Sequence, residues 1–113
     1  LDDFIENKRK LAFKYKMALK NIEGVTFFDE PENCHSNFWL NTILLDEKFA
    51  QDHVKRNELL DKFHSVGIRA RPIWSLVHKM PMFRAYPKME INVAENLEAR
   101  IINLPSSSDL LVS

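Results

Sequence analysis

The sequence predicts an α+β domain in which a small antiparallel sheet of about three strands carries helices packed on one face. Stretches with the apolar spacing of a helix alternate with short runs of β-branched, aromatic and long aliphatic residues. Their order is helix, strand, strand, helix, strand, helix, which implies a mostly antiparallel sheet with its helices to one side. With 113 residues, of which 45% are hydrophobic, the chain has the size and composition of one domain with its own core.

The first helix is expected over residues 3–22, because apolar residues recur there with helical spacing while the lysines mostly turn outward. The apolar face consists of Phe4, Leu11, Tyr15, Ala18, Leu19 and Ile22. Gly24 follows at the position where a left-handed residue commonly ends a helix. Residues 25–28 are then expected to form a short strand, which ends at the polar run 29–33.

The central strand is expected over residues 37–45, which are rich in side chains that favour strands. Because successive side chains of a strand point to opposite faces, its residues divide into two sets. Phe38, Leu40, Thr42 and Leu44 share one face, and Trp39, Asn41, Ile43 and Leu45 share the other, so the strand is expected to be buried on at least one side. Residues 46–56 are polar and give no clear assignment.

A second helix is expected over residues 57–66, followed by a strand over residues 68–73. Pro72 has no backbone N–H to donate, so it indicates the end of that strand or the edge of the sheet. Residues 74–92 contain further prolines and predict irregular chain. Residues 93–102 predict the third helix.

The composition argues against several classes of function, among them nucleic-acid binding, metal binding and membrane association. Lys+Arg and Asp+Glu both number 16, so the formal net charge is zero, which disfavours nucleic acid as a partner. The longest block of like charge, residues 8–10, is typical of the solvated face of a helix. One cysteine, Cys34, and four histidines without metal-ligand spacing predict neither a disulfide framework nor a metal site. No apolar run of membrane-spanning length and no signal-peptide pattern are present, so we expect a cytoplasmic protein with no membrane partner.

The densest group of functional side chains lies in residues 67–78, where Arg69, Arg71, Trp74 and His78 follow one another closely. Such side chains are more costly to leave unpartnered in a core than aliphatic ones. Several of them at the end of one strand therefore indicate a site.

Together with residues 79–83, this stretch resembles the C-terminal part of the DegT/DnrJ/EryC1/StrS aminotransferases. The likeness extends in order along essentially the whole chain. Its other signposts are Gly24-Val25, Ser36-Asn37-Phe38-Trp39 and Ile101-Ile102-Asn103-Leu104-Pro105-Ser106-Ser107. The chain is most similar to the branch that makes 4-amino sugars for bacillosamine and legionaminic acid. The resemblance implies the fold of the small C-terminal domain of type I pyridoxal-phosphate aminotransferases.

The resemblance also implies that residues 1–113 are one domain of a larger enzyme, excised from its large domain. Members of this family use pyridoxal phosphate to aminate nucleotide-linked 4-keto sugars, commonly with glutamate as the amino donor and as homodimers. The lysine that binds the cofactor belongs to the large domain, so we expect no cofactor, no catalytic residue and no turnover for this chain alone. Leu1, which begins almost inside a helix without a capping residue, agrees with that expectation.

By position in the family motif, Arg71, Trp74 and His78 are the candidate substrate-binding residues. An arginine can form charge-assisted bonds to a phosphate, and a histidine can bond a sugar hydroxyl or a phosphate oxygen. The residues expected to support the site or the domain junction are Arg69, Trp39, Ser106 and Ser107.

Simpler interpretations stay open for each of these residues. His78 can be a structural histidine bonded to a backbone carbonyl, Arg71 can form an ion pair between domains, and the tryptophans can be packing residues. The alternative function is a standalone small α/β module that binds or senses a ligand without catalysis. It is favoured if the native gene begins near Leu1 and the first helix is properly capped.

Overall fold

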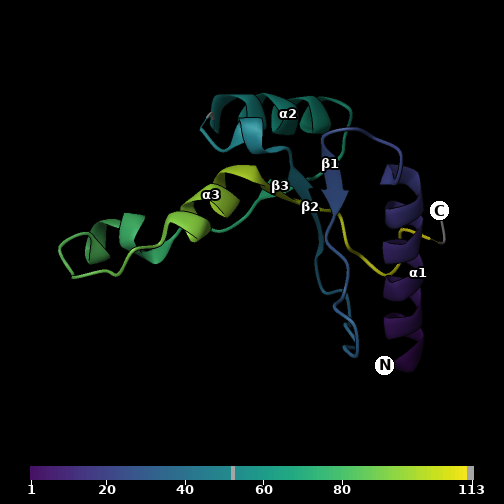
Figure 1. Ribbon diagram of the computed structural model, residues 1–113. Helices are drawn as coiled ribbons and strands as arrows, with labels where there is room; N and C mark the ends of the chain where they lie inside the picture. The colour runs from purple at the N-terminus through teal and green to yellow at the C-terminus, as the bar shows by residue number, and fades with distance from the viewer. Residues whose placement is uncertain (52, 112–113) are drawn as a thin grey trace.

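The computed structural model describes residues 1–51 and 53–111. Its helices and strands alternate along the chain much as the sequence predicts (Figure 1). They are α1 (Asp2–Leu19), β1 (Val25–Phe27), β2 (Asn41–Leu45), α2 (His53–Ser65), β3 (Arg71–Pro72), α3 (Asn92–Arg100) and β4 (Ile101–Leu104). Short 3-10 turns lie at Glu47–Phe49, Val77–Lys79 and Pro81–Phe83.

The four strands form one antiparallel sheet in the order β1-β2-β4-β3. Ile43 of β2 lies opposite Phe27 of β1 on one side and Ile102 of β4 on the other. The predicted α+β class with a small antiparallel sheet is confirmed, but the sheet has four strands instead of about three. The extra strand is β4, because the third helix ends at Arg100 and Ile101 already has extended backbone angles.

The core lies between the sheet and the helices α1 and α2, which confirms helices on one face. Its buried residues are Ile43, Leu45, Leu60, Ala70, Ile102 and Leu104. Tyr15 and Leu19 of α1 pack against this cluster, as do Leu59 and Phe63 of α2. The predicted alternation of the central strand is correct, because Asn41, Ile43 and Leu45 are all buried.

The central strand begins later than predicted, at Asn41 instead of residue 37. Phe38 has a φ of 45°, in the left-handed region that a bulky side chain rarely adopts, so the chain turns before it enters the sheet. The strand β3 is also shorter than the predicted 68–73 and lies at the sheet edge, where Pro72 removes a donor. In contrast, α2 begins at His53, earlier than the predicted residue 57.

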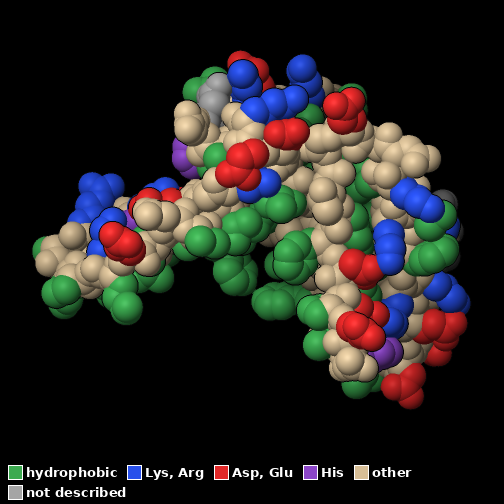
Figure 2. Space-filling model, viewed as in Figure 1, with side chains coloured by type: hydrophobic (Ala, Val, Ile, Leu, Met, Phe, Trp, Pro, Cys, Tyr) green, Lys and Arg blue, Asp and Glu red, His purple; other side chains and the backbone are tan. Residues whose placement is uncertain are grey.

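The molecule is not spherical. Its Cα radius of gyration is 15.8 Å, whereas a compact chain of this length has about 13 Å. Residues 74–91 and α3 project from the sheet as an arm (Figure 1). Hydrophobic side chains gather in the hollow below this arm, on the side of the sheet away from α1 (Figure 2). Exposed apolar patches of this kind are typical of surfaces that contact another protein or a ligand.

Candidate functional site

The two tryptophans of the chain meet across the sheet. Trp39 precedes β2 and Trp74 follows β3, and β4 lies between these strands. Their ring centroids are 6.3 Å apart with an interplanar angle of 63°, an edge-to-face contact. Both side chains remain open to solvent, with 64% of Trp39 and 69% of Trp74 exposed. The pair is therefore an exposed aromatic surface and not part of the core.

Arg71 lies on the sheet face that the helices leave uncovered. It is the cross-strand partner of Asn103, so the two residues share a face, and β4 turns its neighbours Ile102 and Leu104 to the core. The Oδ1 atom of Asn103 accepts a hydrogen bond from Thr42 Oγ1 at 2.8 Å. A polar row thus crosses the uncovered face, and the exposed Arg71 is its only charged member.

His78 occupies the arm. Its Nε2 atom lies 3.1 Å from Oε1 of Glu95 on α3, and only 17% of the His78 side chain is exposed. The partner is therefore a carboxylate, not the backbone carbonyl of the simpler interpretation. The contact orients the imidazole and joins the turn Val77–Lys79 to α3.

Glu98 of α3 fixes the same turn to the body of the domain. Its carboxylate accepts hydrogen bonds from Lys79 Nζ and from the backbone N–H of Leu76, the latter at 3.3 Å. Its backbone carbonyl accepts a bond of 2.5 Å from Arg56 of α2. Burial opposes the ionisation of Glu98, but the hydrogen bonds from Lys79 and Leu76 outweigh it and lower the pKa below its ordinary value. The carboxylate is thus held charged inside the arm's base.

The two serines expected to support the site or the domain junction differ in their contacts. Ser106 Oγ accepts hydrogen bonds from the backbone and side-chain N–H groups of Asn41, at 2.8 and 3.1 Å, and donates one to the Leu104 carbonyl. The carbonyl of Ser106 accepts a 2.6 Å bond from Lys8 Nζ. Ser107 is exposed, and its hydroxyl bonds to Asp109 two residues further along.

Arg69 shares a groove with Ser107, and none of Arg71, Trp74 and His78 lines it. This apolar groove has a volume of about 580 Å³ and lies between α1, the end of α2 and the segment after β4. The groove also contains Ile43 and Leu104, which belong to the core face of the sheet. The structure therefore brings Trp39 and Trp74 together, turns Arg71 to the uncovered face, and leaves His78 in the arm and Arg69 beside the helices.

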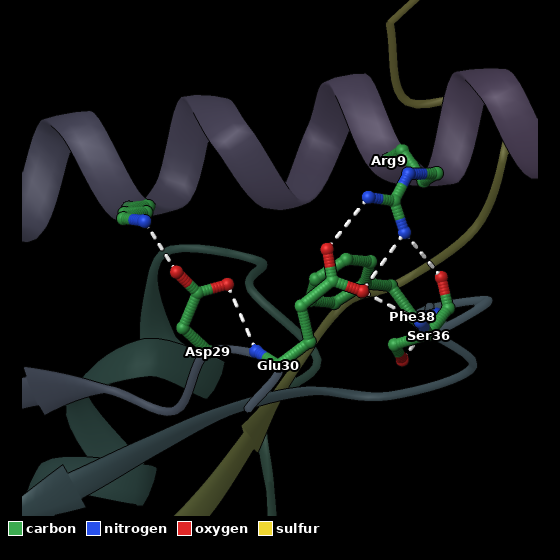
Figure 3. Close-up of polar contacts among 6 residues, drawn as sticks. Arg9, Asp29, Glu30, Ser36 and Phe38 are labelled. Carbon is green, nitrogen blue, oxygen red and sulfur yellow. Dashed lines mark hydrogen bonds and ion pairs between the residues drawn. The ribbon is translucent and has the colours of Figure 1, made fainter. Parts of the chain in front are cut away.

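Sequence reasoning missed an ion-pair cluster at Arg9 (Figure 3). The guanidinium donates to both carboxylate oxygens of Glu30, at 2.6 and 3.0 Å, and to the carbonyl of Ser36 at 2.6 Å. The backbone N–H of Ser36 donates back to Glu30 at 2.6 Å. The hydrogen bonds from Arg9 and then from Ser36 lower the pKa of Glu30 to about 2.

The expectation that residues 8–10 form a solvated face is thus wrong for Lys8 and Arg9. A signal was present in the sequence, because positions 8, 11, 12 and 15 share one side of a helix and the last three are apolar. Lys8 therefore had to lie at the margin of the buried face, where it bonds the carbonyls of Trp39 and Ser106. Lys10 does point outward and pairs with Glu6 at 2.5 Å.

Phe38 follows this cluster, and its backbone has the strained left-handed φ of 45°. A left-handed φ costs a bulky residue about 1–3 kcal/mol and persists only when its surroundings enforce it. The Phe38 ring is buried, stacks on Phe27 at 6.5 Å and lies 5.4 Å from the Arg9 guanidinium. The Phe38 N–H donates to Ser36 Oγ at 3.0 Å. These contacts hold in place the residue that directly precedes Trp39.

Neither a metal nor pyridoxal phosphate fits the groups that the described part of the chain brings together. Residues 1–51 and 53–111 contain no group of three or more His, Cys, Asp or Glu side chains that could hold a metal ion. The cofactor requires a lysine amine at the end of a pocket, an acid at its pyridine nitrogen and donors for its phosphate. Lys8, Lys16 and Lys79 instead bond to carbonyls or carboxylates near the surface. In this part of the chain no helix is long and apolar enough to cross a membrane.

The fold defines a class: a small α+β domain whose sheet is covered by helices on one face only. The model of the DegT/DnrJ/EryC1/StrS aminotransferase family matches residues 1–112, and the chain belongs to this family.

Two curated relatives and one solved structure illustrate the similarity. The chain is 36% identical to GDP-perosamine synthase of Escherichia coli O157:H7 over 110 residues, which is 96% of this chain and 28% of that protein. It is 32% identical over 114 residues to EpsN of Bacillus subtilis (strain 168), named as a pyridoxal phosphate-dependent aminotransferase, covering 97% of this chain and 28% of EpsN. The Helicobacter pylori aminotransferase PseC has the same fold, with a TM-score of 0.82 at 20% identity over 94% of this chain and 28% of PseC. The chain therefore spans just over a quarter of the length of these proteins.

Proposed function

We propose that this chain is the C-terminal domain, residues 1–113, of a pyridoxal phosphate-dependent aminotransferase that aminates a nucleotide-linked 4-keto sugar for amino-sugar or cell-surface glycan synthesis. Family membership and the similarity to GDP-perosamine synthase support the proposal. The cofactor is bound mainly by a large domain outside these residues, and glutamate is the amino donor. The whole enzyme is a cytoplasmic homodimer, and the isolated chain has no turnover.

The observation that carries the proposal is the exposed edge-to-face pair of indoles, because a surface that only meets solvent rarely presents two tryptophans in contact. Arg71 adds an exposed cation on the uncovered face of the same sheet. Arg71 is suited to a phosphate of the nucleotide-sugar, because its guanidinium forms charge-assisted bonds in a planar fork. Trp74 and Trp39 provide apolar walls for a ring of the substrate. Their common role is to bind and orient the sugar nucleotide on the side opposite the cofactor.

His78 has a narrower role in this proposal. Glu95 fixes its imidazole, and His78 bonds a hydroxyl or phosphate oxygen of the substrate at the edge of the arm. Ser106 and Lys8 hold the backbone next to Trp39, so they support the wall without contacting the substrate. Arg69 and Ser107 lie at the junction with the large domain.

The test uses the complete gene product that contains these residues, purified with pyridoxal phosphate and assayed with glutamate against several nucleotide-linked 4-keto sugars. Arg71→Ala is expected to raise KM for the sugar nucleotide, because losing a charge-assisted hydrogen bond removes about 1.5–3 kcal/mol of binding, roughly tenfold to a hundredfold. Arg71→Lys restores little of it, since a point charge cannot replace the fork. Trp74→Ala raises KM in the same direction.

Lys62→Ala is the matched control, because Lys62 is an exposed cation on α2, away from the uncovered face. Its KM should equal that of the wild type. Failure of the complete protein to aminate any nucleotide-linked keto sugar would refute the enzyme assignment. Wild-type KM in both Arg71→Ala and Trp74→Ala would refute the substrate wall. Binding of a ligand by the isolated chain, with no turnover by the complete protein, would favour the standalone module.

A further inference from the structure

The loop between β1 and β2, residues 28–40, is long for an antiparallel connection and has no helix or strand of its own. Loops of about a dozen residues in compact domains are usually functional, and this one ends by presenting Trp39. The indole of Trp39 meets Trp74 from the far side of β4. A loop of this length has many conformations available, so something must select the one that brings the two indoles together.

Side chains of the helix α1 form hydrogen bonds or ion pairs with this loop at three places. Near β1, Lys16 pairs with Asp29. In the middle, Arg9 joins Glu30 and the carbonyl of Ser36. At the end, Lys8 Nζ donates to the carbonyl of Trp39 at 3.4 Å.

The Arg9 contact differs in kind from the other two. Arg9 and Glu30 together use both the N–H and the C=O of Ser36, so the backbone at that point has no freedom to rotate without breaking two bonds of 2.6 Å (Figure 3). The Arg9 guanidinium also lies over the Phe38 ring, where the backbone takes its left-handed turn. The Asp29 carboxylate that pairs with Lys16 accepts a single backbone bond, from the N–H of Glu30, so it holds the backbone by one bond instead of two. Arg9 thus contacts both Ser36 and Phe38, two residues of the strained turn directly before Trp39.

We propose that Arg9 and Glu30 are positioning residues that set the Trp39 indole against Trp74 and thereby assemble the aromatic wall of the substrate site from α1. The inference rests on the proposed function for what the wall binds, but the arrangement of the two indoles is a property of the domain itself. Because the pKa of Glu30 is lowered to about 2, the pair stays charged at any pH used for an assay.

The experiment measures the indole contact and the kinetics separately, both on the complete gene product. Two indoles in edge-to-face contact couple their electronic transitions and give an exciton couplet in far-ultraviolet circular dichroism. The couplet of this pair is the difference between the wild-type spectrum and that of Trp74→Phe, which removes signals from tryptophans elsewhere. Arg9→Met and Glu30→Gln are the test variants. Lys16→Met is the matched control, because it breaks an ion pair between the same helix and the same loop without touching Ser36.

Arg9→Met and Glu30→Gln are expected to lose most of the couplet and to raise KM for the sugar nucleotide by about tenfold, with kcat changed much less, since a displaced binding group weakens substrate positioning. Lys16→Met should keep both the couplet and KM. Arg9→Lys retains the charge but not the fork, so it should recover only part of the couplet. If Arg9→Met does not fold, the isosteric Glu30→Gln provides the same readouts.

The outcomes separate the two proposals. A couplet retained in both Arg9→Met and Glu30→Gln would overturn the positioning role, whatever the kinetics show. A couplet lost equally in Lys16→Met would also overturn it, because any loosening of the loop would then suffice. A couplet lost only in the test variants, with KM unchanged, supports the positioning role and instead counts against the substrate wall of the proposed function.

Discussion

Ser106 Oγ accepts hydrogen bonds from both N–H groups of Asn41, although the two residues lie 65 positions apart in the chain. Asn41 is fully buried at the start of β2, and Ser106 follows the end of β4. The contact closes the end of the sheet next to Trp39. It also distinguishes Ser106 from its neighbour Ser107, whose hydroxyl bonds to Asp109.

Ser106→Ala is expected to lower the free energy of unfolding by about 1–3 kcal/mol, because it leaves two buried donors of Asn41 without an acceptor. Ser107→Ala should stay within about 0.5 kcal/mol of the wild type, since Ser107 is exposed and bonds only to nearby Asp109. Urea unfolding of both variants measures the difference. Equal stabilities would show that water replaces the Ser106 hydroxyl at no cost.

Ile102→Ala should be far more damaging than Val93→Ala. Ile102 is fully buried between Ile43 and Pro72 in the sheet register, and truncation of such a side chain costs about 2–5 kcal/mol. Val93 is 74% exposed on α3, so its truncation should cost less than about 0.5 kcal/mol. The comparison tests whether β4 is a central strand, because a helical or frayed segment at Ile102 would make the two losses similar.

The stability of the domain should fall in acid through the Arg9–Glu30 pair. The pKa of Glu30 is lowered from 4.5 to about 2 in the folded state, so the native state binds fewer protons than the unfolded state over this range. The stabilisation is therefore fully present above about pH 5 and is lost as the pH falls towards 2. Melting temperatures from pH 7 to pH 2 should decline less steeply below pH 5 in Glu30→Gln than in the wild type.

Glu6→Gln is the control for that titration. The pKa of Glu6 is also lowered, by a hydrogen bond and the charge of Lys10, but both side chains are largely exposed. Screening by solvent makes such a pair nearly neutral for stability, so the acid profile of Glu6→Gln should follow the wild type. A Glu30→Gln profile parallel to the wild type would contradict the linkage.

Gly67→Ala tests a backbone effect in isolation. Gly67 ends α2 with a φ of +81°, and a Cβ there would meet no atom within 4 Å. Any loss of stability, expected at about 1 kcal/mol, therefore comes from the left-handed backbone alone. Gly67→Asn should lose less, because asparagine tolerates this conformation better than alanine. Equal losses for both substitutions would point to another cause.

Much of the fold follows from local patterns. The helical spacing of Leu11, Tyr15 and Leu19 is enough to predict α1. The alternation within residues 41–45 is enough to predict two distinct faces for β2, but not which of them is buried. The strand β4 could not be found in this way. Its residues follow α3 without a break, and their apolar run fits a last helical turn equally well. Pairing with β2 and β3 on both sides decides the matter, and that pairing involves residues far along the chain.

The candidate site, too, could be predicted from the sequence only in part. The sequence indicated that Arg71, Trp74 and His78 are chemically important, because residues of these types are costly to leave without partners. It could not indicate that His78 faces Glu95, that Arg69 lies apart from Arg71, or that Arg9 pairs with Glu30. Each of those facts depends on the register of the sheet and on the docking of α1.

By itself, the amino-acid sequence determined the class of fold, the helices, the alternation of the central strand and the residue types available for binding. These properties depend on the periodicity of neighbouring side chains, which is local information. Only the tertiary structure decided that Trp39 meets Trp74 and that Arg9 and Glu30 hold the strained turn at Phe38. Contacts between distant residues form only when the packing of the whole domain offsets the conformational entropy lost in closing the loops between them.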